Sequence, residues 1–153
     1  MNKRRVGLIL ISIFICVIIY FQQIPVKLKS TINEEYISGN YNLKARVVEW
    51  QKDTRSSKDF KPINEQKEAA RILNYILNHD VIRTRREYFI TRSNKKVYLE
   101  FRDNDAKMYM DALVIGDEFI VLSLYEEQKR KEKTYVIKDE FDIEYLIKLL
   151  KPE

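Results

Sequence analysis

Glycine and histidine are scarce in this chain of 153 residues, and each shortage excludes a class of site. The three glycines, at positions 7, 39 and 116, stand far apart, so no glycine-rich loop is present to cradle a phosphate or a dinucleotide. His79 is the single histidine, which excludes a multi-histidine metal site and leaves one imidazole base. Because it falls at the predicted end of a helix, His79 is better explained as a surface or capping residue than as a catalyst.

Cysteine occurs once, at Cys16, and the chain beyond residue 21 has none. That part of the chain therefore contains neither a disulfide nor a thiol nucleophile. Ile15 stands where a lipoprotein site needs a small residue, and the apolar run continues after Cys16. We interpret Cys16 as a small apolar residue inside a hydrophobic segment.

Acidic residues are absent from the first 21 positions, where an almost unbroken apolar run extends from Val6 to Phe21. As a helix this run is about 24 Å long, slightly short of the roughly 30 Å hydrocarbon layer of a bilayer. Ile24 extends the run. The sequence therefore predicts a minimal transmembrane helix over residues 6–24.

The flank of this segment sets its predicted orientation. Residues 1–5 carry three basic side chains and no acid, and such flanks stay on the cytoplasmic side of a membrane. Residues 1–5 are therefore predicted as a cytoplasmic tail and the rest of the chain as extracytoplasmic. A cleavable signal peptide, which would give a secreted domain, is the alternative. Tyr20 and Phe21 stand where the peptidase requires small residues, so we favour an uncleaved signal anchor in the cell membrane.

The charge of the remaining chain is nearly balanced. The whole protein has a formal net charge of +5, from 28 Lys and Arg against 23 Asp and Glu, but three of the basic residues belong to the tail. So close a balance argues against nucleic acid as a partner. A membrane-tethered nucleic-acid binder would require the opposite topology, with the domain in the cytoplasm.

The length that follows the apolar segment suits one domain with a hydrophobic core. Residues 25–42 contain Pro25, Ser38 and Gly39 among scattered charges, and they are predicted as a juxtamembrane linker. Residues 43–153 are predicted to form a single extracytoplasmic domain.

Apolar and polar residues alternate in several segments of that domain. This two-residue period predicts strands over residues 43–50, 97–102, 107–115, 119–125 and 134–137. Residues 51–62 are predicted as a polar loop, and Gly116 with Asp117 as a hairpin turn. Residues 107–115 have apolar side chains on both faces, which predicts a bulge near Asp111.

Two segments show helical periods instead. Asn64 is predicted to cap a helix whose buried stripe is Ala69, Ile72, Leu73, Ile76 and Leu77. Asp139 is predicted to cap a second helix with the stripe Phe141, Tyr145, Leu146, Leu149 and Leu150. The predicted fold class is α+β: a transmembrane helix, then a small antiparallel sheet of about five strands with two helices packed on it.

The apolar patterns at residues 72–77, 135–137 and 145–150 together resemble those of a known type of small domain. The chain over residues 43–150 resembles small membrane-anchored or lipoprotein extracytoplasmic domains of unknown function in Gram-positive bacteria. The resemblance implies an extracytoplasmic compartment and an α+β fold, and it brings no activity with it.

Candidate catalytic and metal sites are few. Asp103 and Asp105 lack the glycine and the glutamate that complete a calcium loop, and such acids are usual in hairpin turns. No serine lies in a glycine-flanked elbow that could serve a triad with His79. We therefore predict no catalytic residue, no metal site and no cofactor. Paired carboxylates that cleave glycosides remain open as an alternative, because any two acids can converge in a fold.

Residues 83–96 are dense in positive charge and include Tyr88 and Phe89. The candidate binding residues are Arg83, Arg85, Arg86, Arg92, Lys95 and Lys96. Arginine offers bidentate contacts to phosphate, so lipid headgroups or an anionic envelope polymer are candidate partners. The competing interpretation is an exposed edge strand on which basic residues discourage aggregation.

These observations favour a single-pass membrane protein that displays a small non-enzymatic binding or sensing domain outside the cytoplasm. The expected ligand or partner lies in the cell envelope. A secreted domain and an envelope hydrolase with paired carboxylates are the alternatives, and the sequence leaves the oligomeric state open.

Overall fold

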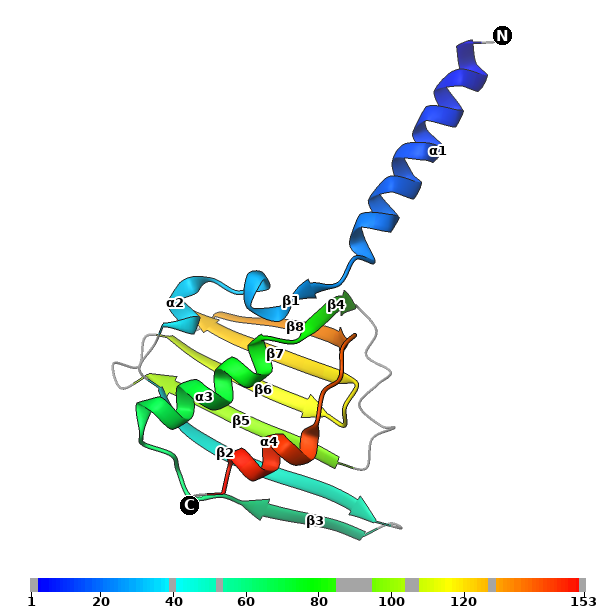
Figure 1. Ribbon diagram of the computed structural model, residues 1–153. Helices are drawn as coiled ribbons and strands as arrows, with labels where there is room; N and C mark the ends of the chain where they lie inside the picture. The colour runs from blue at the N-terminus through cyan, green and yellow to red at the C-terminus, as the bar shows by residue number, and fades with distance from the viewer. Residues whose placement is uncertain are drawn as a thin grey trace.

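The computed structural model describes residues 3–38, 41–51, 54–84, 95–103, 108–126 and 129–151. Within them the chain forms an α+β fold, in which one antiparallel sheet of eight strands is packed against helices (Figure 1). The predicted fold class and the antiparallel sheet are confirmed.

A helix of 20 residues, α1 (Lys3–Gln22), precedes the domain and projects away from it (Figure 1). Its described large apolar side chains are exposed, from Val17 at 44% to Tyr20 at 69%. Within the described residues, no helix combines the length and the apolar character that crossing a membrane requires. A helix lies where one was predicted, and its passage through a membrane stays a prediction.

The chain after α1 folds into the domain at once. It forms β1 (Val26–Lys27), the 3-10 helix η1 (Leu28–Thr31) and the short helix α2 (Glu34–Ile37). Leu28 is fully buried, and Ile32 and Tyr36 also belong to the hydrophobic core. Residues 25–42, predicted as a linker, therefore contribute core side chains.

The other strands are β2 (Tyr41–Gln51), β3 (Thr54–Asp59), β4 (Asp80–Thr84), β5 (Lys95–Asp103), β6 (Met108–Ile115), β7 (Phe119–Glu126) and β8 (Lys129–Ile137). Their order across the sheet is β1-β4-β8-β7-β6-β5-β2-β3, and neighbouring strands pair antiparallel. The strands β5 to β8 form a meander, which matches the order predicted for them.

The sheet has eight strands where about five were predicted, so that estimate was too low. The predicted polar loop contains β3, whose six side chains are all exposed. An edge strand with no buried face has no apolar alternation, so its sequence shows no strand period. The strands β1 and β4, of two and five residues, are too short to display a period.

The predicted bulge near Asp111 is wrong. The register of β6 runs without interruption against both β5 and β7, with Asp111 opposite Glu100 and Ser123. Apolar residues occupy both faces of β6 because both faces are partly covered, and this needs no extra residue. The turn that follows β6 is confirmed, with Gly116 at φ 54 between β6 and β7.

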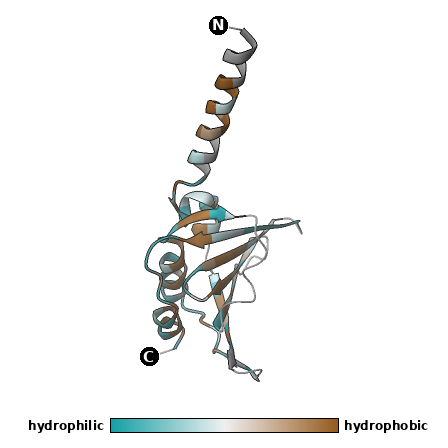
Figure 2. Ribbon diagram, turned by 90° about the vertical axis from the view of Figure 1, so that its right-hand side faces the viewer, coloured by the Kyte–Doolittle hydropathy of each residue, from teal (hydrophilic) through white to brown (hydrophobic). Residues whose placement is uncertain are grey.

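The helices α3 (Gln66–Leu77) and α4 (Ile143–Leu149) lie on the same face of the sheet, as Figure 2 shows. The stripe predicted for the first helix is confirmed, since Ala69, Ile72, Leu73, Ile76 and Leu77 are all buried. Asn64 is not its cap, because α3 begins after Glu65 and has no side-chain cap.

Asp142 caps α4 by accepting a hydrogen bond from the backbone NH of Tyr145, so the predicted cap at Asp139 is wrong. The buried face of α4 consists of Ile143 and Leu146, with Leu150 just beyond its end. Tyr145, predicted to be buried, is exposed. The helix is shorter than predicted and starts later, but Phe141, Leu146 and Leu150 of the predicted stripe are buried.

Candidate ligand-binding face

One face of the sheet packs against α3 and α4, and within the described part of the chain no helix covers the other (Figure 2). In β5, for example, Val97, Leu99 and Phe101 enter the core, while the residues between them point to the opposite side. We call that opposite side the helix-free face.

Four cross-strand rows make up the helix-free face over β5, β6, β7 and β8. The tyrosine row is Arg102, Tyr109, Tyr125 and Arg130; the carboxylate row is Glu100, Asp111, Ser123 and Glu132; the apolar row is Tyr98, Leu113, Val121 and Thr134; the phenylalanine row is Lys96, Ile115, Phe119 and Val136. Polar rows and apolar rows thus divide the face into two halves.

The tyrosine row is a stack of rings and guanidinium groups. Tyr109 and Tyr125 stack with ring centroids 4.0 Å apart and an interplanar angle of 13°. Arg102 lies 5.5 Å from the centre of the Tyr109 ring, and Arg130 lies 5.9 Å from that of Tyr125. These cation–π contacts hold each arginine above the carboxylate row.

Two of the three acids in the carboxylate row are ion-paired. Arg102 approaches Glu100 at 3.1 Å, and Arg130 forms an ion pair with Glu132. Arg130 also donates hydrogen bonds to the hydroxyl of Ser123, at 3.1 Å and 3.3 Å. Ser123 is buried, so its hydroxyl takes part in a satisfied polar network.

Asp111 is the exception in this row. Its carboxylate accepts a hydrogen bond from the Tyr125 hydroxyl, but its Oδ1 atom is buried and has no partner among the described residues. Burial raises the pKa of Asp111, and the neighbouring charge of Glu100 acts in the same direction. Burial likewise raises the pKa of Tyr125, followed by the effect of the Asp111 charge. The fold therefore holds a carboxylate in a place that disfavours its ionised form.

A hollow of about 340 Å³ lies on these rows. Its polar lining includes Asp111, Ser123, Arg130 and Glu132, and its apolar lining includes Leu113, Ile115, Phe119 and Val121. Tyr98 and Glu100 also line it, and they are shared with a second hollow of about 420 Å³ over β2, β3 and β5. The two hollows therefore adjoin.

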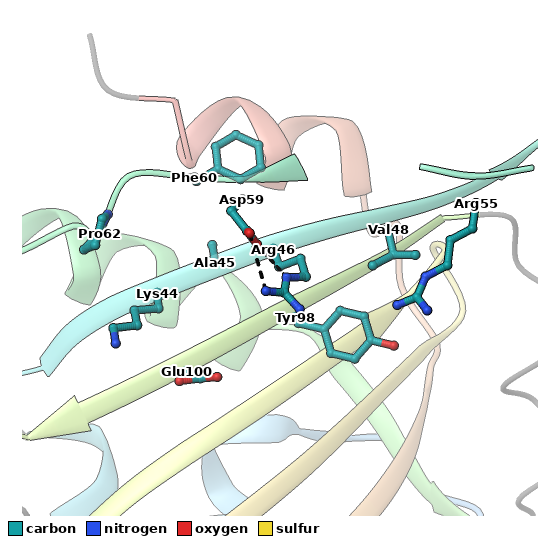
Figure 3. A pocket seen from close by; sticks show the side chains of 10 residues that line it. All are labelled: Lys44, Ala45, Arg46, Val48, Arg55, Asp59, Phe60, Pro62, Tyr98 and Glu100. Carbon is teal, nitrogen blue, oxygen red and sulfur yellow. Dashed lines mark hydrogen bonds and ion pairs between the residues drawn. The ribbon is translucent and has the colours of Figure 1, made fainter. Parts of the chain in front are cut away.

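Figure 3 shows the second hollow. Arg46 and Asp59 form an ion pair on neighbouring strands, and the hydrogen bond to Asp59 raises the pKa of Arg46. Lys44 and Arg55 lie to either side of this pair. This end of the helix-free face is richer in basic residues than the carboxylate row.

The predicted basic binding residues do not form one cluster in the described structure. Arg83 lies on β4, which β8, β7 and β6 separate from Lys95 and Lys96 on β5. Lys95 forms ion pairs with Glu49 and Glu144, and the hydrogen bond to Glu144 raises its pKa. Lys96 belongs to the phenylalanine row of the helix-free face. Arg85, Arg86 and Arg92 lie outside the described residues.

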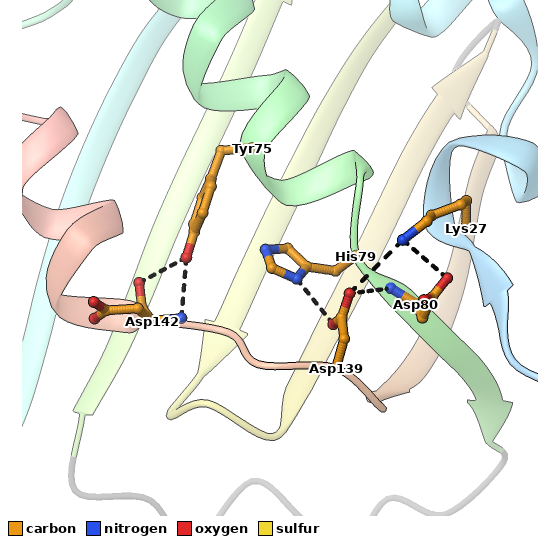
Figure 4. Close-up of polar contacts among 6 residues, drawn as sticks. All are labelled: Lys27, Tyr75, His79, Asp80, Asp139 and Asp142. Carbon is orange, nitrogen blue, oxygen red and sulfur yellow. Dashed lines mark hydrogen bonds and ion pairs between the residues drawn. The ribbon is translucent and has the colours of Figure 1, made fainter.

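His79 lies on the other side of the sheet, in a structural cluster (Figure 4). Its Nδ1 is 2.9 Å from Asp139, whose other oxygen accepts the backbone NH of Asp80 at 2.8 Å. Lys27 of β1 approaches Asp80 at 3.1 Å and Asp139 at 3.9 Å. Partial burial alone would raise the pKa of Asp139, but the Asp80 NH and His79 together lower it. The cluster joins β1, β4 and the segment before α4.

Tyr75 of α3 lies beside this cluster, on the helix-covered side of the sheet. Its hydroxyl donates to the carbonyl oxygen of Asp142 and accepts from the backbone NH of the same residue, both at 3.0 Å (Figure 4). Its ring contacts His79 and Phe141, with centroids 5.0 Å and 5.3 Å apart. These contacts fix α3 to the start of α4. The C-cap of α3 is Asn78, and the His79 side chain contacts Asp139 instead, so its role in the described structure is to join these segments.

The described residues contain no group of three or more His, Cys, Asp or Glu side chains placed to hold a metal ion. Asp117, which follows Gly116 in the turn, accepts the backbone NH of Ile143 at 2.9 Å. Asp105 lies outside the described residues.

Comparison with known proteins gives no match: neither a family model, nor a curated protein, nor a solved structure is significantly similar to the chain.

Sequence reasoning missed the helix-free face as a candidate site. The polar residues that alternate with the core positions of β5 and β6, such as Glu100 and Asp111, are visible in the sequence as the second face of each strand. The register that places Glu100, Asp111 and Ser123 in one row is not visible, because pairing between strands depends on the whole sheet.

Proposed function

We propose that the protein is a membrane-attached binding module: α1 anchors it, and the helix-free face of its extracytoplasmic domain takes a ligand without catalysing a reaction. The observation that carries this proposal is the pair of adjoining hollows on that face, in which charged and apolar side chains meet. Clefts of a few hundred cubic ångströms that combine an apolar wall with a few polar groups are the usual form of ligand sites.

The membrane part rests on α1 and its flank. Ile11 and Phe14 of α1 are 58% and 66% exposed, although a helix so apolar needs a nonpolar environment. A bilayer would supply that environment, and the basic residues before Val6 favour a cytoplasmic N-terminus. A cell membrane with the domain on its outer side is therefore the proposed location.

An envelope hydrolase is the second candidate, because Glu100 and Asp111 are directly opposite each other and line one hollow. Cross-strand partners have Cβ atoms about 4.5–5.5 Å apart, which suits two carboxylates acting on one glycosidic bond. However, Glu100 is ion-paired with Arg102, while Asp111 bonds Tyr125 and has its Oδ1 buried. The two carboxylates are therefore not a free pair that could act together on one glycosidic bond, and this favours binding.

Protease treatment of intact protoplasts that express the full chain with a C-terminal tag tests the proposed location. We expect the full-length protein in the membrane fraction and loss of the tag from outside. Lysed cells serve as the control for tag cleavage. Protection of the tag in intact protoplasts, or a shortened chain in the medium, would contradict the proposal. Turnover of nitrophenyl glycosides that Glu100→Gln abolishes would instead support the hydrolase.

A further inference from the structure

Among the acids that line the smaller hollow, Asp111 is the one that forms no ion pair with a described side chain. Glu100 and Glu132, the other acids of its lining, form ion pairs with Arg102 and Arg130. Asp111 forms no ion pair within the described residues, and the Tyr125 hydroxyl that it binds is neutral. Burial raises the pKa of Asp111 and the charges of Arg102 and Arg130 lower it, but neither arginine forms an ion pair with it, so a cation in the hollow would be attracted to its carboxylate.

The surroundings of Asp111 add an apolar requirement. Leu113 and Val121 follow the carboxylate row directly, and Ile115 and Phe119 lie one row further. The ring of Tyr98 borders the same hollow and is 39% exposed, so its face is available to a cation. A ligand that fills this space presents its charge at one end and an apolar body at the other.

We propose that this hollow binds a small organic monocation, with its ammonium group against the Asp111 carboxylate and its apolar body over Leu113 and Val121. The proposal rests on the proposed function and deepens it by naming the class of ligand. The volume of about 340 Å³ fits a ligand of one ring and a short chain.

Other ligand classes fit less well. An anion would meet the charge of Asp111 in a partly buried site, where like charges repel strongly. A metal ion needs several oxygen or nitrogen ligands, and the described residues contain no such group. A neutral apolar ligand would leave the Asp111 charge without compensation.

Three probes with the same apolar body and different charge test the proposal: phenethylammonium, 2-phenylethanol and 3-phenylpropionate. Binding to the full chain in an uncharged detergent is measured by isothermal titration calorimetry and by saturation-transfer NMR. We expect the ammonium probe to bind at least tenfold more tightly than either of the others. Equal affinity for all three probes would overturn the proposal.

Variants then assign the preference to Asp111. Asp111→Asn removes the charge with little change of shape, and the tenfold preference for the ammonium probe should disappear. Glu68→Gln makes the same charge change on α3, on the far side of the sheet, and should keep the preference. A thermal unfolding curve for each variant shows that it is folded. An unchanged preference in Asp111→Asn would refute the proposal.

A different occupant has its own signature. A second variant has residues 85–94 replaced by a glycine–serine linker. If this variant binds the ammonium probe and the natural chain binds no probe, residues of the chain compete with the probe for the hollow. That result would rule out an external ligand. If neither binds any probe, the ligand class is wrong. The protoplast experiment is independent of all these results, so a failure of the membrane-attached location is recognised separately.

Discussion

At the scale of single residues, Asp111 is the clearest conflict between stability and the local environment. A buried carboxylate oxygen without a hydrogen bond costs free energy, and natural proteins keep such groups mainly at functional sites. The neighbouring acids are neutralised by arginines that the Tyr109 and Tyr125 rings hold in place. The charge of Asp111 therefore lowers the stability of the folded chain, at the position where the proposed cation would bind.

Asp111→Asn should raise the free energy of unfolding at pH 7 by about 1 kcal/mol, because it removes a partly buried charge. A gain of this size corresponds to a Tm roughly 2–4 °C higher in a chain of this length. Since the folded state raises the pKa of Asp111, the cost of its charge is absent below the unfolded pKa. The difference in Tm between Asp111→Asn and the natural chain should therefore disappear as the pH falls towards 4. Thermal unfolding from pH 4 to pH 8 measures it, and a lower Tm for the variant at pH 7 would contradict this account.

The pKa of Asp139 is shifted in the opposite direction to that of Asp111. Its lowered pKa means that its charge stabilises the folded state above the unfolded pKa, and this contribution is lost as the pH falls through the folded pKa. Asp139→Asn should lower the free energy of unfolding at pH 7 by about 1–2 kcal/mol, because hydrogen bonds to a charged group are lost. The two proteins should converge only when the pH falls below the folded pKa of Asp139, which lies under the ordinary value of an aspartate. The measurement is urea unfolding at several pH values.

The neighbouring acid provides the control for Asp139. Glu140 is exposed, so Glu140→Gln removes the same charge one position away from His79 and Asp80. Its unfolding should match the natural chain within about 0.5 kcal/mol at each pH. If Glu140→Gln were as destabilising as Asp139→Asn, the effect would come from net charge and not from the cluster.

At the scale of elements, the β6–β7 turn depends on Gly116, whose φ of 54 lies in the left-handed region. Gly116→Ala should lower the free energy of unfolding by about 1–2 kcal/mol, since a Cβ atom is crowded there. Asn tolerates this conformation better, so Gly116→Asn is the matched control and should cost less. Urea unfolding compares the three proteins, and equal stability of the Ala and Asn variants would contradict the explanation.

The same scale shows which elements the sequence reveals. The stripe of α3 and the alternation of β5 are visible because one face of each is buried and the other is not. The strand β3 lacks a buried face, so its six exposed residues resemble a loop. Caps were predicted one to three residues too early, because several Asn, Asp and Glu residues precede each helix and tertiary contacts select among them.

At the scale of the whole molecule, α1 and the segment that follows it differ in their relation to the domain. The apolar side chains of α1 that the structure describes are exposed, whereas Leu28, Ile32 and Tyr36 belong to the core. Lys27 in addition forms ion pairs with Asp80 and Asp139. The domain therefore begins near residue 25, before the predicted boundary at residue 43.

Two truncations measure this boundary. Removal of residues 1–24 should leave the Tm of the domain within about 4 °C of that of the full chain, a change of about 1 kcal/mol. Removal of residues 1–38 deletes three core side chains and should cost roughly 5 kcal/mol, at about 1.5–3 kcal/mol for each buried side chain. Circular dichroism melts in an uncharged detergent compare the three forms. A domain that is equally stable without residues 25–38 would show that these residues do not contribute to its stability.

The sequence by itself determined the local features: an apolar helical segment after a basic tail, a helix with its buried stripe, the strand meander and the turn at Gly116. Each of these depends on the order of apolar and polar residues within a few positions. The α+β class follows from that order as well.

Only the tertiary structure decided three features: the size of the sheet, the burial of Leu28, Ile32 and Tyr36, and the row that joins Glu100, Asp111 and Ser123. The basic residues at positions 83 and 96 belong to one basic stretch of the sequence, but β8, β7 and β6 lie between their strands and separate them. The physical reason is common to all these cases. Strand pairing and charge compensation depend on residues far apart in the chain. The local alternation of apolar and polar residues does not indicate the register between strands.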